Sequence, residues 1–221
     1  MIYTEYIEDR ICIFVYIKNF LKRDIYNEIK EYLKNINDWK IGKCDNNNII
    51  KRKQKWYHSE NKYFCNEWKG KYDRWKSNDY NILLKKIENI VQKKINNLIP
   101  NINNIQKPNL NSILINYYKN GDEFIAPHQD SKIVFGENPT ISILSIGEKR
   151  TFKLEKTYKG LLKRDKSKKK YNKEFILEDN SLFIMAGSTQ IDYCHYIPKE
   201  ENKKERYSLS FREHYSKNNT K

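Results

Sequence analysis

Seven residues near the C-terminal end of the chain alternate strictly between polar and apolar side chains. The segment reads Arg206-Tyr207-Ser208-Leu209-Ser210-Phe211-Arg212. Successive side chains of a β-strand point to opposite faces, so both arginines and both serines would share one face. Burying two guanidinium groups inside a sheet is costly unless they meet anions. The segment therefore predicts either a strand that lines an anion-binding cavity or an edge strand with solvated arginines.

The second half of the chain has short β-branched or aromatic runs separated by turn residues, as at Asn120-Gly121. Such closely spaced runs are typical of antiparallel strands. Together they predict a jelly-roll-like double sheet. The expected strands are 114–118, 140–146, 150–156, 174–177, 181–185 and 206–212.

The first half mixes helix and strand signals, so we expect an α+β protein. A β-branched run predicts a strand at 11–17, and apolar residues at helical spacing predict helices at 21–36 and 79–98. The polar, Asn-rich stretch 42–55 is expected to be a loop. With 221 residues, one integrated domain is expected, with an N-terminal part at 1–108, a main part at 109–215 and a tail at 216–221.

The charge balance predicts a polyanionic partner. The chain has 43 Lys and Arg against 28 Asp and Glu, a formal net charge of +15. Nucleic acid is the leading candidate and an acidic membrane surface the second, while a lysine-rich composition without functional meaning remains an alternative. The basic stretch 159–173 is expected to be a solvated loop.

Several sequence features favour an intracellular protein of the nucleus or cytoplasm that does not associate with a membrane, and we expect a monomer. No apolar run approaches the ~18 residues that span a bilayer, and charged residues interrupt the N-terminus. The four cysteines are scattered without a CxxC pair, which indicates reduced thiols and makes a zinc site unlikely.

His128-Gln129-Asp130 is the candidate metal site. On a strand, the imidazole and the carboxylate would point to the same side, and His195 could supply a third ligand. Two histidines and one carboxylate leave three positions open on an octahedral ion, which suits non-haem iron(II) oxygenases. A histidine and an aspartate two residues apart also occur often by chance, so the motif is weak without its context.

The two arginines supply that context. A dicarboxylate co-substrate would give each guanidinium one carboxylate to bind in a bidentate fork. Asn116 and Tyr118 share one face of the strand 114–118 and could bond the same co-substrate, or the strand could simply be half-buried.

Several ordered motifs between about residues 109 and 213 resemble those of AlkB-type dioxygenases, which use iron(II) and 2-oxoglutarate. They are Asn116 to Asp122 for NxYxxGxD, His128 to Asp130 for HxD, Ser145 to Phe152 for SxGxxRxF, Met185 to Pro198 around the distal histidine, and Arg206 to Arg212 for RxSLTFR. The resemblance implies a double-stranded β-helix catalytic core with an N-terminal α/β nucleotide-recognition lid. It implies the iron ligands His128, Asp130 and His195. It also implies 2-oxoglutarate contacts from Asn116, Tyr118, Arg206, Ser210 and Arg212, with Arg206 on the distal carboxylate.

A weaker resemblance lies upstream. Arg52 to Tyr57 resembles the RKQxxYG segment of AlkB homologues that act on DNA, and Tyr63, Phe64 and Cys65 fall where the base-holding lid is expected. Aromatic residues between basic ones suit base stacking and phosphate contact, although they could equally pack the domain. After HxD the family has acidic residues, whereas this chain has Ser131 and Lys132. If the strand continues, Lys132 would point toward the metal-binding face. The expected substrate contacts are Arg52, Tyr57, Tyr63, Phe64, Cys65, Ser131 and Lys132.

The resemblance implies oxidative dealkylation of N-alkylated bases such as N1-methyladenine and N3-methylcytosine, giving succinate, carbon dioxide and an aldehyde. The expected setting is the repair of damaged DNA. The alternatives are an RNA N-methyl demethylase, an oxygenase acting on protein side chains, and a nucleic-acid-binding protein without catalytic activity. The basic charge argues against the second, and the intact set of metal and arginine residues argues against the third.

Overall fold

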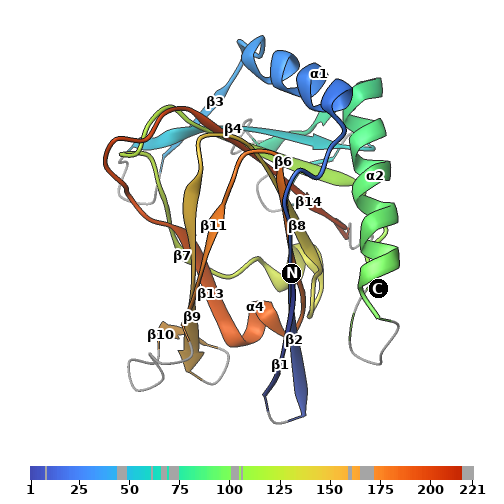
Figure 1. Ribbon diagram of the computed structural model, residues 1–221, viewed down its shortest axis with the longest axis vertical. Helices are drawn as coiled ribbons and strands as arrows, with labels where there is room; N and C mark the ends of the chain where they lie inside the picture. Colours follow the sequence, from blue (N-terminus) through green and yellow to red (C-terminus); the bar gives the residue numbers. More distant parts are fainter. Residues whose placement is uncertain are drawn as a thin grey trace.

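Two β-sheets that face each other form the body of the molecule (Figure 1). The computed structural model describes residues 1–7, 9–43, 49–60, 62–65, 69, 75–100, 105, 107–158, 161–164 and 172–215. Within these residues the larger sheet has nine strands and the smaller has five.

The larger sheet draws its strands from both halves of the chain. Its central strands β8, β14 and β6 come from the second half, and β2 and β4 from the first half join it on either side, each through an antiparallel pairing. Its members in spatial order are β1 (Ile2–Ile7), β2 (Arg10–Ile17), β12 (Ser181–Gly187), β8 (Ile141–Gly147), β14 (Arg206–Arg212), β6 (Ser112–Tyr118), β4 (Ile49–His58) and β3 (Lys40–Lys43), with β5 (Asn78–Asp79) parallel to β4.

The smaller sheet carries the two candidate metal-binding segments. In spatial order it contains β10 (Leu161–Arg164), β9 (Arg150–Tyr158), β13 (Tyr193–Ile197) and β7 (Ile125–His128), while β11 (Lys173–Leu177) pairs with β9. The short helices α3 (Lys132–Phe135) and α4 (Thr189–Asp192) directly follow β7 and directly precede β13.

Two long helices cover the outer face of the larger sheet (Figure 1). They are α1 (Arg23–Lys34) and α2 (Ile82–Leu98), each two to three residues shorter at one or both ends than the sequence predicts. The side chain of Asn81 caps α2 by accepting a hydrogen bond from the backbone N–H of Leu84 at 2.8 Å. No helix in the described ranges is long and apolar enough to cross a membrane.

The alternation of β14 separates two environments. Tyr207, Leu209 and Phe211 pack in the apolar core between the sheet and the helices. Both arginines face the space between the two sheets, as the sequence pattern predicts, and that space also holds a second apolar cluster around Phe14 and Phe152.

The expected loop at 42–55 is wrong where the structure describes it. Residues 42 and 43 end β3, residues 44–48 lie outside the described residues, and residues 49–55 belong to β4. This polar segment becomes a strand through its pairing with β6, a contact that local composition does not encode. Part of the expected loop at 159–173 also forms strands, in β10 and at the start of β11. Residues 159, 160 and 165–171 and the tail at 216–221 lie outside the described residues.

Candidate active site

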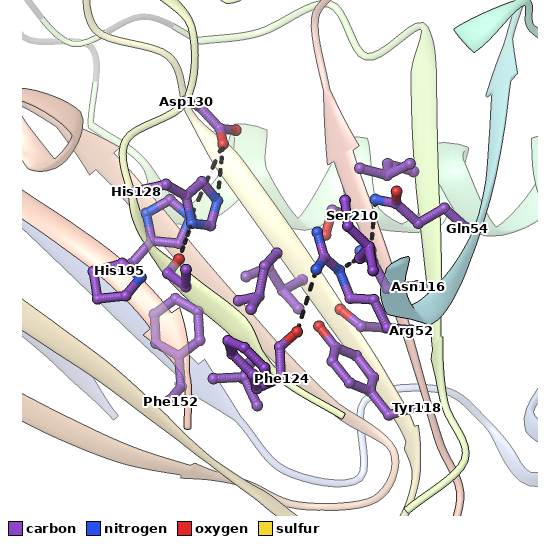
Figure 2. A pocket seen from close by; sticks show the side chains of 18 of the residues that line it. Arg52, Gln54, Asn116, Tyr118, Phe124, His128, Asp130, Phe152, His195 and Ser210 are labelled. Carbon is purple, nitrogen blue, oxygen red and sulfur yellow. Dashed lines mark hydrogen bonds and ion pairs between the residues drawn. The ribbon is translucent and has the colours of Figure 1, made fainter. Parts of the chain in front are cut away.

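The HxD segment and His195 come together where β13 pairs with β7, the edge strand of the smaller sheet. His128 ends β7 and lies directly opposite His195 of β13, with their ring centres 4.2 Å apart. Asp130 follows in the turn before α3, and its Oδ1 lies 3.7 Å from His128 Nε2 and 4.0 Å from His195 Nε2. One ligand atom from each residue lies within 4.8 Å of the others (Figure 2). The three predicted metal ligands are therefore close enough to hold one ion.

Neighbouring groups orient the ligand atoms. The backbone carbonyl of Ala126 lies 2.9 Å from His128 Nδ1, so that nitrogen carries the proton and Nε2 is left as the ligand atom. The guanidinium Nε of Arg212 contacts Asp130 Oδ2, which leaves Oδ1 facing the two imidazoles.

Burial and charge set the protonation states needed for metal binding. Burial holds the pKa of His128 below its usual value and that of His195 well below it, so both imidazoles stay neutral. Burial alone would raise the pKa of Asp130, but the adjacent Arg212 guanidinium and the imidazoles lower it. Neutral imidazoles beside an ionised carboxylate are the forms that bind a metal ion.

A cavity of about 700 Å³ extends from these three residues between the sheets. Its walls include the predicted co-substrate residues Asn116, Tyr118, Arg206, Ser210 and Arg212, together with the apolar side chains of Leu114, Ile125, Ile143, Phe152 and Ile197. The sequence prediction that these polar residues share one space therefore agrees with the structure.

Arg206 lies fully buried in the wall of this cavity. Its Nη2 donates a hydrogen bond to Ser145 Oγ at 2.9 Å, while Nε and Nη1 have no hydrogen-bond acceptor among the described residues. Burial lowers the pKa of Arg206 to about 10, which still leaves the guanidinium charged at neutral pH. A buried cation with two free donors is suited to bind an anion such as a carboxylate.

Asn116 is held in one amide orientation. Its Oδ1 accepts hydrogen bonds from Arg52 Nε at 3.2 Å and from Gln54 Nε2 at 3.1 Å (Figure 2). With the carbonyl oxygen occupied by two donors, the amide nitrogen is the group that can donate to an oxygen atom of a ligand.

Three of the seven residues predicted to contact the substrate line the cavity, namely Arg52, Phe64 and Ser131. Phe64 packs against Trp75 with ring centres 4.6 Å apart and against Phe135 at 5.4 Å. These aromatic residues form one wall of the cavity, and Lys51 and Arg52 from β4 add positive charge to its lining.

The other predicted substrate contacts lie elsewhere. Tyr57 is buried on the helix side of β4, where its hydroxyl is 2.8 Å from that of Tyr32. Tyr63 forms an isolated bridge with Lys76, and neither Tyr63 nor Cys65 lines the cavity.

Lys132 also lies outside the cavity lining. The expectation of a continuing strand is wrong at this position, because the chain turns into α3 after Asp130. The Lys132 ammonium pairs instead with Glu137, 2.9 Å away.

Three residues around the site lie in the motifs described above, but they were assigned no role from the sequence. Gln54 follows Arg52 by two positions, so it would have been placed beside Asn116 had β4 been predicted as a strand. Phe152 stacks on the His195 ring with centres 5.6 Å apart. Gln190 accepts a hydrogen bond from the backbone of Asp130, and no local pattern in the sequence predicts that contact.

The model of the 2OG-Fe(II) oxygenase superfamily matches residues 13–213. The chain belongs to this superfamily. Its curated relatives include the DNA oxidative demethylase ALKBH2 of Arabidopsis thaliana, 32% identical over an alignment of 117 residues that covers 46% of this chain. The alpha-ketoglutarate-dependent dioxygenase alkB homolog 3 of Homo sapiens is 36% identical over an alignment of 113 residues that covers 47% of this chain. These matches cover 37% and 36% of the relatives' own lengths.

Solved structures of oxygenases share the fold. The structure of OsALKBH1 superposes with a TM-score of 0.57 at 14% identity, covering 90% of this chain and 97% of that one. A prolyl hydroxylase from Trichoplax adhaerens, in complex with a peptide fragment, gives 0.57 at 12% identity and covers 91% and 83%. The predicted α+β double-stranded β-helix and the AlkB-type family are confirmed, and with them iron(II) and 2-oxoglutarate as the cofactors of the superfamily.

The residues present fit these cofactors. His128, Asp130 and His195 supply two imidazoles and one carboxylate, the donor set that non-haem iron(II) favours. The two free donors of Arg206 suit one carboxylate of 2-oxoglutarate.

Proposed function

We propose that the protein oxidatively removes alkyl groups from N-alkylated bases of nucleic acid. The observation that carries the proposal is one continuous cavity that joins a two-histidine, one-carboxylate cluster and a buried arginine to an aromatic and basic wall. The names of two relatives, a DNA oxidative demethylase and an alkB homolog, support the same reaction class.

The inner part of the cavity would hold the cofactors. His128, Asp130 and His195 would bind iron(II), and Arg206 would bind the distal carboxylate of 2-oxoglutarate. Iron(II) with 2-oxoglutarate and oxygen supplies oxidation of an N-alkyl carbon, so that the alkyl group leaves as an aldehyde and 2-oxoglutarate becomes succinate and carbon dioxide.

The chain's own residues would position the reactants and exclude water. The Asn116 amide nitrogen would donate to a co-substrate oxygen, because Arg52 and Gln54 occupy its carbonyl. The apolar side chains of Ile143 and Phe152 would keep bulk water from the reacting carbon.

The aromatic wall would receive the base. Phe64 and Trp75 offer ring faces for stacking, and Lys51 and Arg52 would contact the phosphate backbone. A base in a duplex would have to flip out of the stack to reach the metal. The formal charge of +15 favours such a polyanionic partner.

The test is incubation of the full chain with iron(II), 2-oxoglutarate, oxygen and oligonucleotides. Single-stranded and duplex DNA and RNA carrying N1-methyladenine or N3-methylcytosine form separate arms, and succinate and formaldehyde are the readouts. We expect formaldehyde in amounts equal to succinate from at least one arm, and none from unmethylated controls. A basic methylated peptide forms a further arm. Product from that arm alone would overturn the proposal in favour of a protein oxygenase.

A further inference from the structure

A single helical turn, α4, lies beside the metal-binding segment. Gln190 of α4 is 2% exposed, and its Oε1 accepts a hydrogen bond from the backbone N–H of Asp130 at 3.0 Å. The backbone of this metal ligand is therefore held by a side chain from a segment sixty residues away in the sequence.

The contact between the two segments is reciprocal. Gln129, the middle residue of the HxD motif, donates from Nε2 to the backbone carbonyl of Ile191 at 3.0 Å and lies 3.4 Å from that of Tyr193. The Thr157 hydroxyl of β9 donates to the same Ile191 carbonyl at 2.7 Å. Gln190 of α4 therefore binds the backbone of the HxD segment, and Gln129 of the HxD segment binds the backbone of α4.

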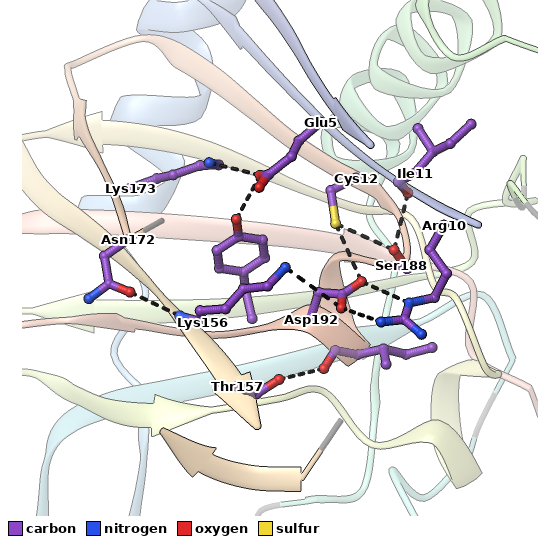
Figure 3. Close-up of polar contacts among 12 residues, drawn as sticks. Glu5, Arg10, Ile11, Cys12, Lys156, Thr157, Asn172, Lys173, Ser188 and Asp192 are labelled. Atoms are coloured by element: carbon purple, nitrogen blue, oxygen red, sulfur yellow. Dashed lines mark hydrogen bonds and ion pairs between the residues drawn. The ribbon is translucent and has the colours of Figure 1, made fainter. Parts of the chain in front are cut away.

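The last residue of α4, Asp192, lies in a charged cluster (Figure 3). Asp192 is 4% exposed, and Arg10 of β2 binds both of its carboxylate oxygens at 2.8 and 3.2 Å. The Lys156 ammonium lies 3.7 Å from the same carboxylate, and the Cys12 thiol is also directed at it. This cluster ties α4 to the N-terminal hairpin formed by β1 and β2.

We propose that Gln190 is a positioning residue for the iron ligand Asp130, and that the ion pair between Arg10 and Asp192 holds Gln190 in place. A buried backbone N–H without an acceptor is unfavourable, because it loses its hydrogen bond to water and gains none in the protein. Without the Gln190 acceptor, the turn at Asp130 would move to recover a hydrogen bond, and the carboxylate would leave its place opposite the two imidazoles. The inference concerns the metal centre and holds for any substrate.

The direct test is metal binding by the full apo chain, because it does not depend on turnover. Mn²⁺ is titrated into wild type and into Gln190→Leu, which keeps the bulk of the side chain and removes the acceptor. We expect binding at least tenfold weaker, in the range found when residues that support metal ligands are changed. Gln190→Glu keeps an acceptor oxygen at the same reach and should recover most of the affinity.

The absorption spectrum of Co²⁺ at saturation separates positioning from general destabilisation. If Gln190 positions Asp130, the saturated Gln190→Leu variant has an altered ligand-field spectrum at a temperature where circular dichroism shows it folded. A folded variant with the wild-type spectrum and the wild-type Mn²⁺ affinity would overturn the proposal.

The ion pair is tested with a matched pair of variants at opposite ends of β2, because Arg10 is its first residue and Lys18 directly follows its last. Arg10→Met breaks the contact to Asp192, whereas Lys18→Met breaks an exposed pair with Glu178 that is far from α4 in the sheet. We expect Arg10→Met to weaken Mn²⁺ binding at least threefold and Lys18→Met to leave it unchanged. Equal affinities in the two variants would remove Arg10 and Asp192 from the proposal.

Discussion

Arg206 and Arg150 place their guanidinium groups against the same tyrosine ring, 5.3 and 5.6 Å from the centre of Tyr118. Both are fully buried, but they differ in their partners. Arg150 donates to the Glu200 carboxylate at 2.7 Å and to three backbone carbonyls. In the part of the chain that the structure describes, two nitrogens of Arg206 have no hydrogen-bond acceptor. Arg150 is therefore satisfied within the fold, whereas Arg206 is suited to bind a ligand.

We predict that Arg206→Ala raises the 2-oxoglutarate concentration needed for half-maximal activity at least tenfold. Hydrogen bonds to charged groups contribute about 1.5–3 kcal/mol, and ~1.4 kcal/mol corresponds to one decade of affinity. Arg206→Lys should recover the affinity only in part, because an ammonium cannot form the two-pronged contact. Arg150→Met is the control and should lower the melting temperature. If Arg206→Ala needed no more 2-oxoglutarate than wild type, residues other than Arg206 would bind the co-substrate.

The metal prediction concerns His128, Asp130 and His195. Replacing any one of them with Ala should abolish formaldehyde release and weaken Mn²⁺ binding, while circular dichroism shows a folded chain. The controls are His58→Gln and His214→Gln, since neither imidazole belongs to the cluster that could hold a metal. Both control variants should bind Mn²⁺ like wild type. Undiminished product from His195→Ala would refute the assignment.

Ser131 is predicted to influence which alkylated bases are accepted. It lines the cavity next to Asp130, whereas Lys132 pairs with Glu137. A carboxylate at position 131 would attract a cationic base such as N1-methyladenine. Ser131→Asp should therefore raise activity on N1-methyladenine at least threefold relative to a neutral N-alkyl base, and Lys132→Glu should leave that ratio unchanged. If Lys132→Glu raised this activity ratio and Ser131→Asp did not, Lys132 and not Ser131 would be the residue that contacts the base.

The stability of the protein should fall as the pH drops from about 6.5 to about 4. Burial and the neighbouring His214 lower the pKa of His58 from 6.5 to about 4. Between these values the unfolded chain binds a proton that the folded chain excludes, so stability decreases with decreasing pH. Below pH 4 the His58 imidazole is protonated in both the folded and the unfolded chain, so its contribution to the loss of stability ends.

Thermal melting between pH 7.5 and 4.5 checks this prediction. The other buried histidines contribute with the same sign, so the measure is the difference between wild type and His58→Gln. The variant should lose less stability over this range. Parallel curves for the two proteins would show that His58 does not titrate in this interval.

The most predictable parts of the structure are those where local alternation and a motif coincide. The faces of β14 follow from its polar and apolar side chains, and the histidine and aspartate of HxD meet His195 as expected. In both cases the chemistry of the side chains allows few alternatives, since buried arginines and clustered metal ligands require specific partners.

The least predictable parts depend on distant contacts. The composition of β4 favours a loop, and the strand forms through its pairing with β6. Arg52 and Tyr57 lie five positions apart on this strand, so they must point to opposite faces and cannot both reach the cavity. Recognising the strand would have excluded Tyr57 from the substrate contacts. The position of Lys132 was also misjudged. The chain turns into α3 after Asp130, so the alternation of side chains along a strand does not continue to Lys132.

The insertion of β14 between β6 and β8 bears on how the molecule is made. Strands β6 and β8 have no hydrogen bonds to each other in the finished sheet, since β14, the last strand that the structure describes, separates them. During synthesis on the ribosome their facing edges stay open until Arg212 has emerged. A fold dominated by pairings this distant in sequence is expected to form slowly and to expose unpaired edges meanwhile. The nascent chain is therefore an expected client of molecular chaperones.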